Sequence, residues 1–164
     1  MRRIIFPAIL VAAACVQPAH SEEIVRRQAG NFPIASTVLV PAGSELVFLS
    51  GTLADPVKAD APAGSAERLG DTEAQVTSVL GKLERELAVS GLSMSDVVKM
   101  NVFLVGDPAK GGSMDFEGLM KAYSRHFGTP AQPKLPARTT VQVVALPMPG
   151  ALVEIEVVAA RMAK

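Results

Sequence analysis

The sequence predicts an α+β domain in which two helices cover one face of a single mixed β-sheet. Two segments, 71–90 and 115–127, carry apolar residues at helical spacing. Several shorter segments are rich in β-branched residues and alternate apolar with polar positions, as strands with one buried face do. The 164 residues are enough for one such domain with its own core and leave little room for a second.

The composition argues against a nucleic-acid-binding protein. Lys and Arg total 16, and Asp and Glu also total 16, so the formal net charge is zero and a basic stripe is not expected. The chain has no Trp and one Tyr, so an aromatic platform for single-stranded nucleic acid is not expected either.

Residues 1–21 have the pattern of a secretory signal peptide. Two arginines precede an apolar stretch, 4–16, and small residues follow at 19–21, where signal peptidase would cleave. We expect cleavage after Ser21 and a periplasmic or secreted domain formed by 22–164. The apolar stretch is about half the ~20 residues that a spanning helix needs, so no membrane association is expected after cleavage.

The single cysteine, Cys15, offers an alternative processing site. It follows three alanines and so weakly resembles a lipoprotein cleavage box. Cleavage after Ser21 is favoured because Ala12 stands where a larger apolar residue usually precedes such a cysteine. That cleavage leaves a mature chain without cysteine, which therefore cannot form a disulfide.

The first part of the mature chain is expected to contain one hairpin. Segment 22–33 is polar and irregular. Two short apolar runs, 37–40 and 46–50, flank a Pro-Ala-Gly-Ser turn at 41–44 and are predicted to pair. Segment 52–70 contains two prolines and no stable periodicity, so we expect a surface loop or at best a ragged edge strand.

Segment 71–90 is the clearest helix. Its N-terminus is predicted to be capped either by a capping box of Thr72 and Gln75 or by Asp71 alone, and Gly91 is a natural stop. Its apolar stripe consists of Val76, Val79, Leu80, Leu83 and Leu87.

A strand, a glycine-rich loop and a second helix follow. The predicted strand is 96–105, the loop is 106–114 and the helix is 115–127. The apolar side of this helix consists of Phe116, Leu119, Met120, Tyr123 and Phe127.

Two last strands, 137–145 and 151–160, are predicted to form a hairpin around 146–150, after an extended proline-rich segment. One parity of this hairpin is apolar and would face the helices. The other parity consists of Arg138, Thr140, Gln142, Glu154 and Glu156. Hairpin pairing would place these five polar groups on one surface of the sheet. An ordinary solvated antiparallel face is the alternative interpretation.

Arg138 has the clearest chemical potential on that surface. It stands at a strand start behind prolines, and a rigidly held guanidinium can bind a carboxylate through two parallel hydrogen bonds. Glu154 lies four pairing positions away, which is about 13 Å at ~3.3 Å per residue. One small molecule cannot easily contact both within one chain. We therefore hypothesise that a site containing both residues lies between subunits.

The most specific segments are Pro-Ala-Arg-Thr at 136–139 and Val-Glu-Ile-Glu at 153–156. They resemble the RidA (YjgF) family of reactive-intermediate deaminases, and the resemblance covers about residues 28–162. Supporting stretches are 46–51, 79–83 and 96–104. The resemblance implies a chorismate-mutase-like fold and a homotrimer whose sheets form a central barrel with three clefts between subunits.

The resemblance also implies a site and a reaction. The family's arginine falls on Arg138, which would bind the carboxylate of a 2-imino acid or enamine such as 2-iminopropionate or 2-aminoacrylate. Its glutamate falls on Glu154, which would orient or deprotonate the attacking water. The backbone around Ser50 and Gly51 would hold the substrate. The products would be a 2-oxo acid and ammonia, and no cofactor is implied because a protonated imine is already electrophilic.

Three departures from the family pattern make the pocket more apolar. Ile34 stands in place of a tyrosine, Met120 in place of a frequent asparagine, and Thr140 in place of a frequent cysteine. The alternative function is therefore a non-catalytic trimer that binds small carboxylates or acts like a chaperone. His126 is the one histidine of the mature chain, so a transition-metal site is not expected.

Overall fold

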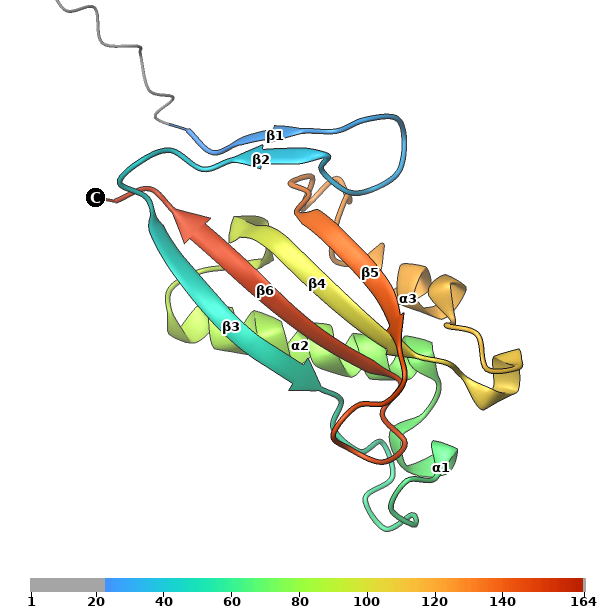
Figure 1. Ribbon diagram of the computed structural model, residues 1–164. Coiled ribbons are helices and arrows are strands. Elements are labelled where there is room, and N and C mark those ends of the chain that lie inside the picture. The colour runs from blue at the N-terminus through green and yellow to red at the C-terminus, as the bar shows by residue number, and fades with distance from the viewer. Residues whose placement is uncertain (1–22, 164) are drawn as a thin grey trace, which may run out of the picture.

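A four-stranded mixed β-sheet forms the centre of this computed structural model, which describes residues 23–163 (Figure 1). Its strands are β3 (Glu45–Leu53), β4 (Val97–Val105), β5 (Ala137–Val143) and β6 (Val153–Arg161). Their order is β3-β6-β4-β5; β4 and β5 are parallel, and the other two ladders are antiparallel. The predicted signal peptide and Cys15 lie outside the described residues.

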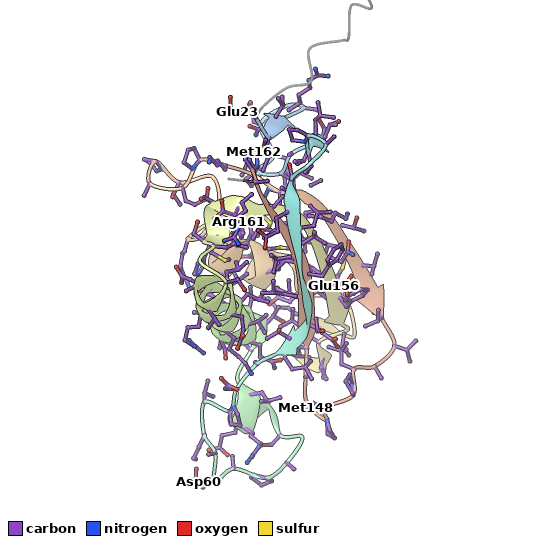
Figure 2. The ribbon with its side chains drawn as sticks, turned by 90° about the vertical axis from the view of Figure 1, so that its left-hand side faces the viewer. Glu23, Asp60, Met148, Glu156, Arg161 and Met162 are labelled. Atoms are coloured by element: carbon purple, nitrogen blue, oxygen red, sulfur yellow. The ribbon has the colours of Figure 1, made fainter. Side chains whose placement is uncertain are left out.

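Two helices, α2 (Thr72–Val89) and α3 (Phe116–Tyr123), cover the same face of this sheet (Figure 1), as the sequence predicts. The other face, which we call the open face, carries no helix. Figure 2 shows the sheet nearly edge-on, with the helical layer on one side and Glu156 on the other. The fold is thus a mixed α+β architecture with one covered and one uncovered sheet surface.

Local sequence accounts for the limits of the helices. Asp71 caps α2 alone, because its carboxylate accepts a 2.8 Å hydrogen bond from the backbone N–H of Ala74. Gln75 is fully buried, and its side chain bonds instead to the backbone of Gly70, Gly150 and Leu152. Helix α3 ends at Tyr123, earlier than predicted, yet Phe127 stays buried and stacks on the Tyr123 ring.

Three short helices occupy segments that the sequence predicts as loop or strand end. They are α1 (Ala66–Leu69), η1 (Met94–Asp96) and η2 (Pro108–Lys110). Among the described residues, no helix combines the length and the apolar character needed to cross a membrane.

The core lies between the helices and the covered sheet face. Met100, Val102 and Leu104 alternate along β4 with solvent-accessible positions and are at most 1% exposed. They meet the predicted stripe of α2, all of whose residues are fully buried: Val76, Val79, Leu80, Leu83 and Leu87. Burying each such side chain stabilises the fold by about 1.5–3 kcal/mol before the entropy of ordering is counted.

The predicted hairpin of 37–40 with 46–50 is wrong. Strand β2 (Thr37–Leu39) pairs instead with β1 (Val25–Arg27), a strand inside the segment predicted to be irregular, and the two form a separate two-stranded sheet. The intervening turn does form, with the Ser44 hydroxyl bonded to the carbonyl of Pro41. Strand β3 pairs with β6 because this places the alternate apolar side chains of β3 against the core, whereas Leu39 on β2 remains 53% exposed.

The predicted hairpin of the last two strands is also wrong, because β4 lies between them. Strand β4 is apolar on its buried face and gains most from a central position, while β5 carries polar residues on the same parity and occupies the edge. The register places Arg138 beside Met100 and Thr140 beside Val102, which puts both on the covered face. Glu154 lies beside Phe103, on the open face. The five polar groups therefore do not share one surface.

Candidate functional site

The seven residues predicted to form a site fall into two clusters on opposite faces of the sheet. The arginine site, at β5 on the covered face, consists of Arg138, Thr140, Met120 and Ile34. The glutamate site, where β3 meets β6 on the open face, consists of Glu154, Ser50 and Gly51. Ile34 belongs to the first cluster because its neighbour Ala35 forms a parallel bridge with Ala137.

Three aromatic rings surround the guanidinium of Arg138. Its Cζ atom lies 4.3 Å from the ring centroid of Tyr123, 5.6 Å from that of Phe32 and 5.8 Å from that of Phe116. These distances are in the range of cation–π attraction. Phe116, Met120 and Tyr123 stand at positions i, i+4 and i+7 of α3, so one side of this helix supplies two of the rings.

The hydrogen-bonding capacity of Arg138 is largely unused. Its Nη2 donates to the Sδ atom of Met120 at 3.3 Å, and a thioether sulfur is a weak acceptor. Its Nη1 is buried without an acceptor, and the Oγ1 atom of Thr140 is also buried without a partner. Within residues 23–163, Arg138 forms no ion pair. Unsatisfied buried polar atoms are rare in folded proteins, and these two belong to residues on the same face of β5, which makes this face a candidate binding place.

Burial controls the electrostatics of the arginine site. It lowers the pKa of Arg138, although the neighbouring Tyr123 acts in the opposite direction, and an arginine remains charged at neutral pH. Burial raises the pKa of Tyr123 to about 12, so its phenol stays neutral. The Tyr123 hydroxyl donates a 2.9 Å hydrogen bond to the carbonyl of Pro33, which fixes the ring beneath the guanidinium. The site therefore presents one uncompensated positive charge on a rigid aromatic floor.

A β-bulge shapes the glutamate site. The register of β3 against β6 shifts between Leu49 and Thr52, which leaves Ser50 and Gly51 outside the regular pairing. A Cβ atom at Gly51 would collide with the Oε1 atom of Glu154, so glycine is required for the carboxylate to lie against the strand. No described residue donates a hydrogen bond to Glu154.

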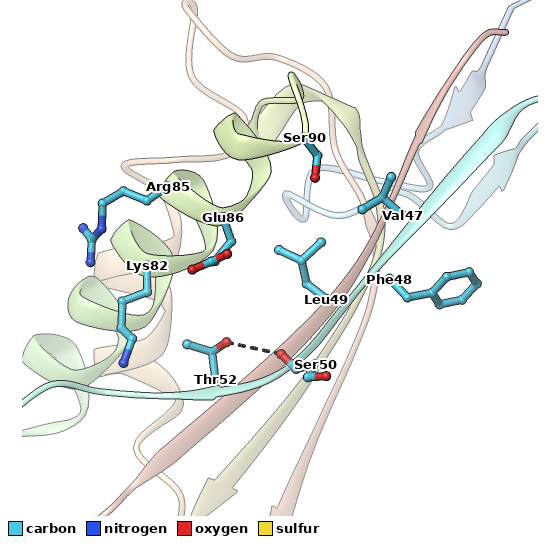
Figure 3. Close-up of a pocket in the computed structure, with 9 residues that line it drawn as sticks. All are labelled: Val47, Phe48, Leu49, Ser50, Thr52, Lys82, Arg85, Glu86 and Ser90. Carbon is cyan, nitrogen blue, oxygen red and sulfur yellow. Dashed lines mark hydrogen bonds between the residues drawn. The ribbon is translucent and has the colours of Figure 1, made fainter.

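Ser50 lies at the border of two hollows. One, of about 470 Å³, lies between β3 and α2, and the other, of about 230 Å³, lies on the open face. Figure 3 shows Leu49 pointing toward α2 and Phe48 pointing away from it, with the Thr52 hydroxyl bonded to the Ser50 carbonyl at 3.2 Å. The bulge therefore exposes backbone at the point where the two sheet surfaces meet.

Glu156 contrasts with Glu154 although both point to the open face. Its Oε1 accepts a 2.7 Å hydrogen bond from the Nδ2 of Asn101. Nearby, the Nζ of Lys99 donates to the hydroxyl of Thr139 at 2.9 Å. Glu156 is thus engaged within the sheet, while Glu154 is available to an outside group.

Arg138 and Glu154 are not brought together within one chain. The register places Arg138 level with Met100 and Glu154 level with Phe103, three residues apart or about 10 Å along the strands. The two side chains also leave opposite faces of the sheet. The sequence prediction of a shared surface is therefore wrong, but the inference that one small molecule cannot contact both residues of one chain holds.

Sequence reasoning did not select the aromatic rings of the arginine site. Phe116 and Tyr123 had been predicted only as the apolar side of a helix, and Phe32 precedes the proline of the element that departs from the family pattern. Their spacing on α3 indicates that the two rings share one side of the helix. It does not indicate that they face Arg138, because which strand lies beneath α3 depends on the topology of the sheet. In the region 23–163, no group of three or more His, Cys, Asp or Glu is placed to hold a metal ion.

The sequence is similar to a known protein family and to individual members of known families. Residues 28–161 match the family described as Endoribonuclease L-PSP. Protein DfrA of Myxococcus xanthus is 39% identical over 128 residues, which are 77% of this chain and 84% of that protein. The RutC family protein PH0854 of Pyrococcus horikoshii is 33% identical over 90 residues, which are 55% of this chain and 63% of that protein.

Two solved structures show the same fold. The crystal structure of E. coli TdcF with bound serine is 30% identical, with a TM-score of 0.54, and the match covers 85% of this chain and 98% of that one. The structure of Rv2704 from Mycobacterium tuberculosis, a member of the YjgF/YER057c/UK114 family, is 27% identical, with a TM-score of 0.51 and coverage of 71% and 79%.

Proposed function

The chain belongs to the Endoribonuclease L-PSP (YjgF/RidA) family, and from this premise we propose that it hydrolyses small 2-imino acids and their enamine tautomers to 2-oxo acids and ammonia. The observation that carries the proposal is the guanidinium of Arg138, which is half-buried, charged and without an anionic partner among residues 23–163. A carboxylate matches its planar fork and supplies the missing acceptors. TdcF, which crystallised with serine, supports this because serine carries a carboxylate beside a nitrogen-bearing carbon.

The proposed reaction needs one anchor and one base. Arg138 holds the carboxylate of the substrate, and Glu154 accepts a proton from a water molecule as the water oxygen bonds to the imine carbon. The C=N bond becomes a single bond, and Glu154 returns the proton to the nitrogen. Glu154 then takes the proton of the new hydroxyl group and passes it to the nitrogen as the C–N bond breaks, so that ammonia leaves and the carbonyl of the 2-oxo acid forms. One water is consumed, and nothing is oxidised or reduced.

The proposed site is shared between copies of the chain. Because Arg138 and Glu154 lie on opposite sheet faces, the base must come from a neighbouring copy. Three large apolar side chains on the open face are exposed: Leu46 by 46%, Phe48 by 73% and Val141 by 41%. An apolar surface of this kind favours burial against another chain. We therefore propose a homotrimer in which the open face of each copy contacts the arginine site of the next.

The proposal also includes a compartment. The pattern of residues 1–21 supports export to the periplasm or the outside of the cell. Substrates would then be imines that arise or arrive in that compartment.

Mixing two inactive variants tests the shared site. Arg138→Ala and Glu154→Gln should each lose nearly all acceleration of 2-iminopropionate decay. When the two are co-expressed, activity should return to about a quarter of the wild-type value, because each site then has an even chance of an intact arginine and of an intact glutamate. As a control, Arg138→Ala expressed in the same way without Glu154→Gln should stay inactive.

Two outcomes would contradict parts of the proposal. Without recovery in the mixture, the site is not shared between copies. If the wild-type protein does not accelerate imine decay but binds pyruvate through Arg138, the chain is a carboxylate-binding trimer, which is the alternative that Ile34, Met120 and Thr140 favour.

A further inference from the structure

The accessible surface beside Arg138 is aromatic. The rings of Phe32 and Phe116 stack with centroids 6.2 Å apart and planes 13° from parallel. Phe32 is 44% exposed and Phe116 is half-buried, whereas Tyr123 is completely buried. A molecule that reaches the guanidinium therefore contacts these first two rings.

Distances connect the rings to a bound substrate. A carboxylate that takes the place of the Met120 sulfur at Nη2 has its oxygen about 2.7–2.9 Å from that nitrogen. The ring centroids of Phe32 and Phe116 lie only 5.6 and 5.8 Å from Cζ, so both rings are close to any group bound at the guanidinium. A substrate side chain that extends from the carboxylate toward these rings can pack against the Phe32–Phe116 pair.

The remaining wall offers little to a polar side chain. Ile34 and Met120 are partly buried apolar residues packed against the core. Besides the guanidinium itself, the site contains one polar atom without a hydrogen-bond partner, the Oγ1 of Thr140. Among these residues of one copy, a charged substrate side chain would lose its hydration without gaining a partner.

We infer that this site selects carboxylate ligands with large apolar side chains, such as the 2-imino acids derived from leucine and phenylalanine, and that Phe32 and Phe116 determine this selectivity. The inference rests on the proposed function for the role of Arg138 as carboxylate anchor. Each methylene group buried against such a wall favours binding about fourfold, so a leucine-derived ligand should be favoured over an alanine-derived one by at least tenfold.

Binding of the 2-oxo acids tests the inference without any turnover. Titration calorimetry should give Kd values for 4-methyl-2-oxopentanoate and phenylpyruvate at least tenfold below that for pyruvate. Phe32→Ala should reduce this ratio to below about threefold, and Phe32→Leu should retain an intermediate ratio. Val89→Ala, which alters an 86% exposed residue on α2, is the matched control and should leave the ratio unchanged.

Kinetics with imines separate this inference from the proposed function. An amino-acid oxidase with catalase generates the imines of alanine, leucine and phenylalanine, and their decay is compared with and without the protein. If no imine decays faster but the Kd ratios follow the expectation, hydrolysis fails and the selectivity stands. If pyruvate binds as tightly as phenylpyruvate, or if Phe32→Ala leaves the ratio unchanged, the selectivity inference is overturned even when imines are hydrolysed.

Discussion

The two faces of the sheet present two incomplete sites of opposite charge. On the covered face, Arg138 is enclosed by aromatic rings and lacks acceptors. On the open face, Glu154 lies against a glycine in a bulge, and no described residue donates to it. Each site lacks the kind of group that the other carries. A single copy of this fold therefore holds both candidate groups but leaves them too far apart to act on one small molecule.

The different surroundings of Arg138 and Glu154 predict different costs for mutation on the two faces. A guanidinium held among aromatic rings without acceptors costs stability, whereas a carboxylate on the uncovered face costs less.

Arg138→Met should separate function from stability. Activity toward imines should fall by about 10²–10³, because the carboxylate anchor is lost. The free energy of unfolding should change by less than about 1 kcal/mol, since a methionine fills a similar volume without a buried charge. Imine decay and urea denaturation measure the two effects. A loss of more than about 2 kcal/mol would mean that the arginine is structural.

The burial of Tyr123 predicts a loss of stability at alkaline pH. Its pKa is about 12 in the folded protein and about 10 when unfolded, so the folded state is favoured by the neutral phenol below pH 10. As pH rises from 10 to 12, the unfolded phenol ionises first, and about 2–3 kcal/mol of stability should be lost. Tyr123→Phe should lack this contribution. Urea denaturation of both proteins from pH 9 to 12 measures this contribution. If the free energy of unfolding has the same pH dependence in the variant and the wild type, the prediction is contradicted.

Gly51→Ala should disable the open face without unfolding it. The new methyl group collides with the end of a flexible side chain, so the Glu154 carboxylate is displaced while the backbone, whose φ is not positive, is undisturbed. We expect roughly a tenfold loss of activity with a change in unfolding free energy below about 1 kcal/mol. Equal activity of variant and wild type would show that the position of Glu154 is unimportant.

Glu156→Gln should have the smallest effect. Glu156 already bonds to Asn101, and a glutamine can keep an acceptor at the same place. Activity should remain within about threefold of wild type and stability within about 1 kcal/mol. Beside Glu154→Gln, this variant is the matched control for charge on the open face. A large loss of activity in this variant would mean that Glu156, and not Glu154, accepts the proton from water.

Periodicity predicted the elements of this fold more reliably than their pairing. The apolar stripe of α2 and the alternation along β4 depend on short-range spacing, and both are confirmed. Both predicted hairpins were wrong because a short connection between two strands does not require them to be neighbours. In each case a third strand, β6 or β4, offered better burial for the apolar side chains.

The site residues were predictable only one by one. The resemblance to a known family selected Arg138 and Glu154, but parity within a strand does not determine which face of the sheet a residue occupies. That assignment depends on the neighbouring strand, here β4 for both residues. Phe32 could not be placed near Arg138 from sequence, because a long-range contact from the loop after β1 brings them together.

Strand β6 comes last among the strands of residues 23–163, and yet it lies in the interior of the sheet, between β3 and β4. Its ladder with β3 joins Arg161 to Glu45. The sheet therefore cannot assemble before β6 (Val153–Arg161) has been synthesised, about a hundred residues after β3. A chain terminated early would keep two bare strand edges, which marks it for aggregation or proteolysis rather than for assembly with intact copies.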